Sequence, residues 1–146
     1  MKKKIFFFLA ISLVGLFFYY NRDLFLSTID LPRSRPEYIE VVITAANTGN
    51  DFSWRLDSSE KMRLITNMLF QGIELHSHTH EPVANIKIFY PDKETITIYL
   101  YHGHVGDSFE FSYKEKTFVI DKVTFLNALK GAGVDVSLLS HHVHHH

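Results

Sequence analysis

The stretch VANIKIFYPDKETITIYLY, residues 83–101, decides the fold of this 146-residue chain. On either side of Pro91-Asp92-Lys93-Glu94, isoleucines recur at every second residue, which places them on one face of a β-strand. A proline followed by polar residues between two such runs is typical of a tight turn. The stretch therefore predicts strands over residues 83–90 and 95–101, joined as an antiparallel hairpin.

Two further hairpins are predicted from the same pattern. Residues 38–46 and 52–56 flank the turn Asn47-Thr48-Gly49-Asn50, and Trp54 is expected to join the core. Residues 109–113 and 117–120 flank Lys114-Glu115-Lys116. Short turns join neighbouring strands of antiparallel sheets. We therefore expect an antiparallel sheet of about six strands.

A first amphipathic helix is predicted between these hairpins. It begins at Asp57, an N-cap residue with Glu60 at capping-box spacing, and it ends at Gly72. Its apolar face comprises Met62, Leu64, Ile65, Met68 and Leu69. Asp57 and Glu60 are better explained as capping residues than as a catalytic pair of carboxylates.

A second helix closes the predicted domain. Asp121 caps residues 122–130, and Gly131 and Gly133 end the helix. Its apolar face comprises Val123, Phe125, Leu126 and Leu129. Two amphipathic helices need a sheet face to cover, so the order β-β-α-β-β-β-β-α predicts an α+β fold with two layers.

The N-terminal segment is predicted to be a transmembrane helix. Lys2, Lys3 and Lys4 precede an apolar run over residues 5–20, which spans about 24 Å as a helix, against about 30 Å for a bilayer core. A cleaved signal peptide would end in small residues, whereas this run ends in Phe-Phe-Tyr-Tyr, so a retained anchor is favoured. The lysines predict a single-pass protein of the cell membrane, with a cytoplasmic N-terminus and an extracytoplasmic domain.

These features predict four regions: a membrane anchor (1–22), a proline-containing stalk or linker (23–37), an extracytoplasmic α+β domain (38–136) and a histidine-rich tail (137–146). Residues 21–146 carry 12 basic and 16 acidic side chains, a balance that argues against nucleic-acid binding. The chain has no cysteine, which excludes disulfides, thiolate metal sites and lipidation at a cysteine.

Histidines suggest a metal site. If the hairpin pairs Ile88 with Ile96, His80 lies opposite His104, with His78 and His102 near by. Imidazoles at those spacings can bind zinc, and Glu81 or Asp107 could add an oxygen ligand. The competing interpretation is a pair of solvated loops, because Pro82 and Gly103 both interrupt strand ladders. A pH-sensing cluster is a further alternative.

Aromatic side chains suggest a binding surface. Phe89, Tyr99 and Tyr101 have the opposite strand parity to the isoleucines and should lie on the other face of the sheet. An exposed aromatic face favours a bound partner, unless a helix or the stalk covers it. Signatures of catalysis such as G-x-S-x-G and H-E-x-x-H are missing from the sequence, which favours a protein that is not an enzyme.

The pattern of residues 57–131 resembles that of small exported lipoproteins and membrane-anchored proteins of Gram-positive bacteria. The resemblance lies in the strands Ile86-Lys87-Ile88-Phe89-Tyr90 and Ile96-Thr97-Ile98-Tyr99-Leu100, and in Thr117-Phe118-Val119-Ile120 before the closing helix. It implies export and a membrane location but no activity. This chain departs from the lipoproteins because it lacks their cysteine.

The sequence thus predicts a non-catalytic, membrane-anchored domain that binds a protein or a cell-envelope component through Phe89, Tyr99 and Tyr101. The alternative is a zinc-type metal-binding domain that uses His78, His80, His102 and His104.

Overall fold

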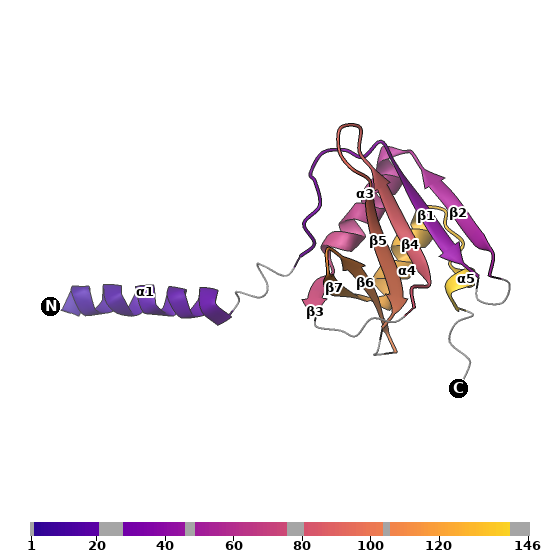
Figure 1. Cartoon of the computed structure of the whole chain (residues 1–146). Helices are drawn as coiled ribbons and strands as arrows, with labels where there is room; N and C mark the ends of the chain where they lie inside the picture. The colour runs from indigo at the N-terminus through magenta and orange to yellow at the C-terminus, as the bar shows by residue number, and fades with distance from the viewer. Residues whose placement is uncertain (1, 21–27, 46–48, 76–80, 104–105, 141–146) are drawn as a thin grey trace.

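The computed structural model describes residues 2–20, 28–45, 49–75, 81–103 and 106–140 (Figure 1). The elements in chain order are α1 (Lys2–Tyr20), β1 (Tyr38–Thr44), β2 (Asp51–Leu56), α3 (Ser59–Phe70), β3 (Ile73–Leu75), β4 (Ala84–Phe89), β5 (Ile96–His102), β6 (Ser108–Tyr113), β7 (Lys116–Asp121), α4 (Lys122–Gly131) and α5 (Ser137–Ser140). The predicted α+β class is confirmed.

The described strands form one seven-stranded sheet in the order β2-β1-β4-β5-β6-β7-β3, and all its neighbouring strands are antiparallel. The register that pairs Ile88 with Ile96 is the one observed. The expectation of about six strands missed β3, which pairs with β7 at the edge of the sheet. β3 has only three residues, and its apolar side chains, Ile73 and Leu75, are exposed rather than buried. A run this short carries too little alternation to be recognised.

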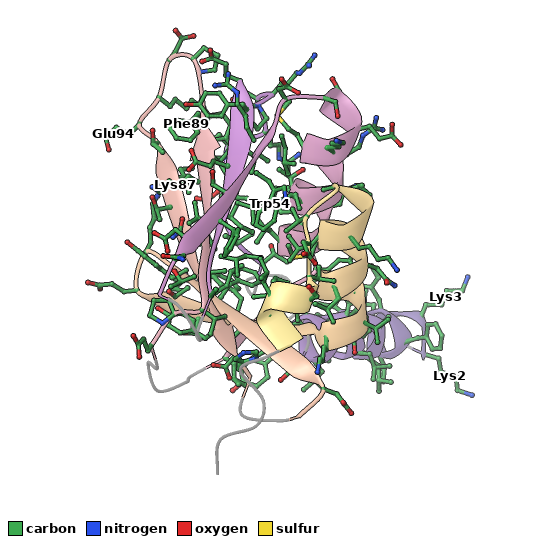
Figure 2. All side chains as sticks on the ribbon, turned by 90° about the vertical axis from the view of Figure 1, so that its right-hand side faces the viewer. Lys2, Lys3, Trp54, Lys87, Phe89 and Glu94 are labelled. Carbon is green, nitrogen blue, oxygen red and sulfur yellow. The ribbon has the colours of Figure 1, made fainter. Side chains whose placement is uncertain are left out.

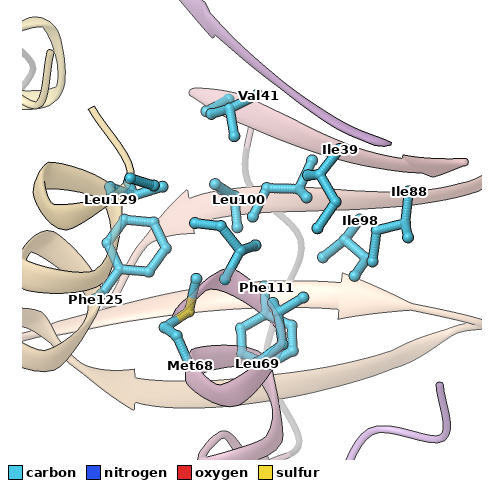
Figure 3. Packing of buried hydrophobic residues seen from close by; sticks show 14 of the residues in the cluster. Ile39, Val41, Met68, Leu69, Ile88, Ile98, Leu100, Phe111, Phe125 and Leu129 are labelled. Atoms are coloured by element: carbon cyan, nitrogen blue, oxygen red, sulfur yellow. The ribbon is translucent and has the colours of Figure 1, made fainter. Parts of the chain in front are cut away.

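Helices α3 and α4 lie on the same side of the sheet, as Figures 1 and 2 show. We call the side of the sheet toward them the inner face and the opposite side the outer face. The isoleucines of β4 and β5 lie on the inner face and are fully buried at positions 86, 88 and 98. Figure 3 shows them packed with side chains of both helices, including Met68, Leu69, Phe125 and Leu129.

The start of α3 differs by one residue from the prediction. The N-cap is Ser58, whose hydroxyl accepts a hydrogen bond from the Lys61 backbone N–H at 3.3 Å. The predicted capping box of Asp57 and Glu60 is therefore wrong. Serine caps helices as well as aspartate does, so sequence alone does not choose between the two adjacent residues.

Gly72 lies just after the end of α3, as predicted, but for a different reason. Its backbone does not adopt the left-handed conformation that usually selects glycine after a helix. A Cβ at this position would instead lie 2.5 Å from Cζ of Phe111. Glycine is thus required because the chain passes directly over an inner-face aromatic ring on its way into β3.

The two ends of α4 agree with the prediction. Asp121 caps the helix by accepting a hydrogen bond from the Thr124 N–H at 3.0 Å. At the other end, Val134 N–H donates to the Leu129 carbonyl at 3.0 Å, and Gly133 has a φ of +88°. This is a Schellman arrangement, in which the left-handed residue has to be glycine or asparagine. The apolar face is smaller than expected, because Val123 is 65% exposed.

The core reaches beyond residues 38–136. Ile29 and Leu31, in the segment expected to be a stalk, are buried in the same cluster as the sheet residues. Leu139, in the unpredicted helix α5, is also buried there. Both flanking segments of the chain therefore contribute to the stability of the folded domain.

Helix α1 covers the N-terminal apolar run. Within the residues that the structure describes, no helix combines the length and the apolarity that a membrane crossing requires. The transmembrane helix is thus the part of the fold prediction that is not confirmed.

Candidate functional site

A cavity of about 520 Å³ opens between residues 31–36 and one side of α3. It is lined by Leu31, Pro32, Arg33, Ser34, Arg35, Pro36, Ser59, Met62, Arg63, Thr66, Phe70 and Tyr90. The lining contains three arginines and no acidic residue. The chain has an excess of acidic over basic residues after position 20, so this cluster of positive charge runs against the overall balance. We call this cavity the arginine pocket.

Buried side chains hold the walls of the arginine pocket in place. Leu31 packs into the core and fixes the segment that carries Arg33 and Arg35. The hydroxyl of Tyr90, at the end of β4, donates a hydrogen bond to the Pro32 carbonyl at 3.5 Å. Burial raises the pKa of Tyr90 above its usual value, and the neighbouring hydroxyl of Tyr113 raises it further.

The three guanidinium groups of the arginine pocket are exposed to solvent. None of them forms an ion pair with a carboxylate among the described residues. The apolar side chains of Met62 and Phe70 lie in the same cavity. The pocket therefore combines hydrogen-bond donors of fixed positive charge with an apolar surface, an arrangement suited to an anion that carries an apolar group.

The sequence-based prediction did not identify the arginine pocket, because it treated residues 23–37 as a solvated stalk. The sequence does contain a sign that this segment is ordered. Ile29 and Leu31 are two residues apart, as in a segment with one buried side, and Pro32 and Pro36 restrict the backbone around the arginines. The contribution of Arg63 could not have been found, since it lies on a helix that is distant in sequence.

Phe89, labelled in Figure 2, lies on the side of the sheet away from α3 and α4. The strand register places Tyr99 and Tyr101 on the same outer face. Phe89 stacks on Tyr38 of β1, with ring centroids 4.2 Å apart. The Tyr101 hydroxyl lies 3.2 Å from the Ser112 hydroxyl, within hydrogen-bond distance. Tyr99 is 45% exposed and offers the most accessible ring of the three predicted residues. The structure thus places them on one face, and their role in binding stays a prediction.

Charged side chains cross the outer face in a row. Glu40 of β1 lies opposite Arg55 of β2 on one side and opposite Lys87 of β4 on the other. The guanidinium of Arg55 also lies over the ring of Tyr38, 3.9 Å from its centroid. One end of the outer face therefore presents both signs of charge next to a stacked aromatic pair.

Three of the four predicted metal ligands, His78, His80 and His104, lie outside the described residues. The fourth, His102, ends β5 and is half-buried, with its ring 5.2 Å from that of Phe109 on the inner face. It lines a second cavity of about 420 Å³ together with Thr44, Ala45, Gly49, Glu81, Pro82 and Val83. Within the described part of the chain, no three histidine, aspartate or glutamate side chains are grouped to hold a metal ion.

Comparison of the chain with models of protein families, with curated proteins and with solved structures finds no match.

Proposed function

We propose that this protein is a membrane-attached, non-catalytic binding domain, in which α1 inserts into the membrane and the outer face binds a protein partner. The observation that carries the proposal is the surface of α1. Its large apolar side chains from Ile5 to Tyr19 are between 50% and 77% exposed. Exposed apolar surface of this extent is unfavourable in water, at about 25 cal/mol per Å².

The distribution of these side chains favours insertion over other ways of covering them. A helix that lies flat at a membrane surface has a polar face, but α1 is apolar on all sides after Lys4. Lys2, Lys3 and Lys4 would then remain among the lipid headgroups. Lysines at this end also favour a cytoplasmic N-terminus and an extracytoplasmic domain, because positive charge is retained on the cytoplasmic side.

Flotation of the full chain with phosphatidylcholine vesicles tests the attachment. The variant Leu9→Lys/Val14→Lys places two charges inside the apolar run, each of which costs about 2.5–3.5 kcal/mol at the centre of a membrane helix. We expect the wild-type chain to float and this variant to stay at the bottom of the gradient. Val123→Lys is the matched control, because Val123 is an exposed valine of the folded domain. Flotation of both lysine variants would contradict insertion of α1.

The proposed partner surface is the outer face around Tyr99. Tyrosine and arginine are enriched among the residues that dominate protein–protein binding energies, and this face carries Tyr38, Tyr99, Tyr101 and Arg55. Its alternating charges and aromatic rings are complementary to another polar protein surface rather than to lipid tails. We therefore propose a protein partner for this face.

Site-specific photocrosslinking tests the partner surface in cells that make the full chain. A benzoylphenylalanine at position 99 should give a discrete crosslinked product of higher mass. The same group at Asn127, an exposed residue of α4 on the other side of the domain, should not. Equal products from both positions, or none from position 99, would remove the outer face as the binding surface.

A metal-binding function is the second candidate, and the strand register favours it. The pairing of Ile88 with Ile96 is the condition under which His80 would face His104. Zinc titration by calorimetry, comparing the chain shortened after Ser140 with its His80→Ala/His104→Ala variant, tests this directly. A single site that the double variant loses would support the metal candidate, and equal heats from both proteins would reject it.

A further inference from the structure

We infer that the arginine pocket binds the phosphate headgroup of an anionic membrane phospholipid. The inference rests on the proposed attachment of α1 to a membrane. It concerns a different surface from the outer face, because the pocket is formed by residues 31–36, α3 and the end of β4.

The charge of the arginine pocket is complementary to that of a phosphate group. Arg33, Arg35 and Arg63 line one cavity, and no acidic residue lines it with them. They are three of the five arginines in the chain, in which acidic residues outnumber basic ones after position 20. Guanidinium groups bind phosphate oxygens through paired N–H donors. Because no described carboxylate is ion-paired with these arginines, their donors are available to a bound anion.

Part of the lining of the arginine pocket is apolar. Leu31, Met62 and Phe70 line the same cavity as the three arginines and supply the apolar part of its wall. A cavity of about 520 Å³ is in the range of small-molecule sites, and it is large enough for a glycerophosphate group and the first carbons of its acyl chains. Inorganic phosphate or a sugar phosphate would leave this apolar surface in contact with water.

A short segment of chain joins α1 to the arginine pocket. Leu31 follows the last residue of α1 by only 11 positions. A fully extended chain of that length spans at most about 40 Å at roughly 3.3–3.6 Å per residue. Attachment of α1 to a membrane therefore keeps the pocket within about 40 Å of lipid headgroups. The tether confines the pocket to a zone where phospholipid is the most concentrated phosphate ligand.

The binding experiment is calorimetry on the full chain in a maltoside detergent, with dihexanoyl phosphatidylglycerol as the probe. Three comparison ligands are used: dihexanoyl phosphatidylcholine, glycerol 3-phosphate and inorganic phosphate. We expect one saturable site for phosphatidylglycerol and at least about tenfold weaker binding of each comparison ligand, since each lacks either the net charge or the acyl carbons.

Matched variants locate the site. Arg33→Gln/Arg35→Gln/Arg63→Gln should weaken phosphatidylglycerol binding by at least about tenfold, because it removes the charged donors. Lys93→Gln/Lys114→Gln/Lys130→Gln changes the net charge equally at exposed positions outside the pocket and should bind like the wild type. Phe70→Ser should weaken phosphatidylglycerol binding and leave the weak binding of phosphate unchanged. Melting temperatures of all variants check that the domain is folded.

Three results would overturn the inference: no saturable binding of phosphatidylglycerol, equal loss of binding in both triple variants, or glycerol 3-phosphate binding as tightly as phosphatidylglycerol. The last result would identify a soluble phosphate ester as the ligand. Because the measurement is made in detergent, it does not depend on flotation. Failure of flotation with intact binding would reject the proposed attachment alone, and flotation with no binding would reject the pocket alone.

Discussion

The inner and outer faces of the sheet are made by the same strands but differ in kind. The inner face is a continuous layer of isoleucine, leucine and phenylalanine side chains that α3 and α4 cover. The outer face alternates aromatic rings with charges, as in the neighbouring pairs Tyr38–Phe89 and Glu40–Lys87. Burial on the inner face favours apolar side chains, whereas most side chains of the outer face keep some contact with solvent.

The largest expected difference between the two faces is the cost of removing an aromatic ring. Phe111 is fully buried on the inner face and stacks on Phe118 at 5.2 Å, so Phe111→Ala should lower the free energy of unfolding by about 3–5 kcal/mol. Tyr99→Ala, on the outer face, should cost about 0.5 kcal/mol or less. Urea unfolding of the full chain in a non-ionic detergent measures both values. Similar costs for the two changes would mean that the outer face is also covered.

A smaller loss of stability is expected from a substitution at Gly72, where the chain passes close above the inner face. Gly72→Ala places a methyl group 2.5 Å from the Phe111 ring and should lower the free energy of unfolding by about 1–3 kcal/mol. Gly106→Ala is the matched control, because a Cβ at Gly106 meets no atom within 4 Å. The same urea titration applies. Equal stability of the two variants would show that the ring moves aside at no cost.

The difference between the inner and outer faces also explains which parts of the fold could be predicted from the sequence. The inner face was predictable, because alternating isoleucines such as Ile86 and Ile88 leave one arrangement that buries them all. The hairpins followed from the turns between them. The strand β3 could not be predicted, because its pairing with β7 is set by the path of the chain after Gly72, and exposed Ile73 and Leu75 give no sign of it.

The candidate sites were predictable only where they depend on strand parity. Parity was sufficient to place Phe89, Tyr99 and Tyr101 on one face. Parity could not show that Arg63 lines the same cavity as Arg33 and Arg35, because that cavity depends on how a helix packs beside a loop from the start of the domain. Pockets formed by elements distant in sequence are tertiary properties, and periodicity within one element contains no information about them.

On the outer face, the interaction of Arg55 with Tyr38 should make a modest contribution to the free energy of unfolding. A guanidinium 3.9 Å from a ring centroid at an exposed site contributes about 0.5–1 kcal/mol. A double-mutant cycle with Arg55→Gln and Tyr38→Leu should therefore give a coupling energy of that size in urea unfolding. The same cycle with Lys93 in place of Arg55 is the control. No coupling for Arg55 would indicate that solvent separates the two groups.

The smallest expected change in stability appears only at alkaline pH and arises from Tyr90. This residue lies at the boundary between the inner face and the arginine pocket. Burial raises the pKa of Tyr90 above 10.0, its ordinary value. The unfolded chain then loses the Tyr90 proton at lower pH than the folded chain, so the contribution to stability is present below about pH 10 and is lost as pH rises through the folded pKa. The wild type should therefore lose more stability than Tyr90→Phe between about pH 9 and pH 11. The two proteins differ only at position 90, so the difference between their curves isolates Tyr90. Parallel curves would mean that solvent reaches the hydroxyl beside Pro32 freely, and the wall of the arginine pocket would then be open at that point.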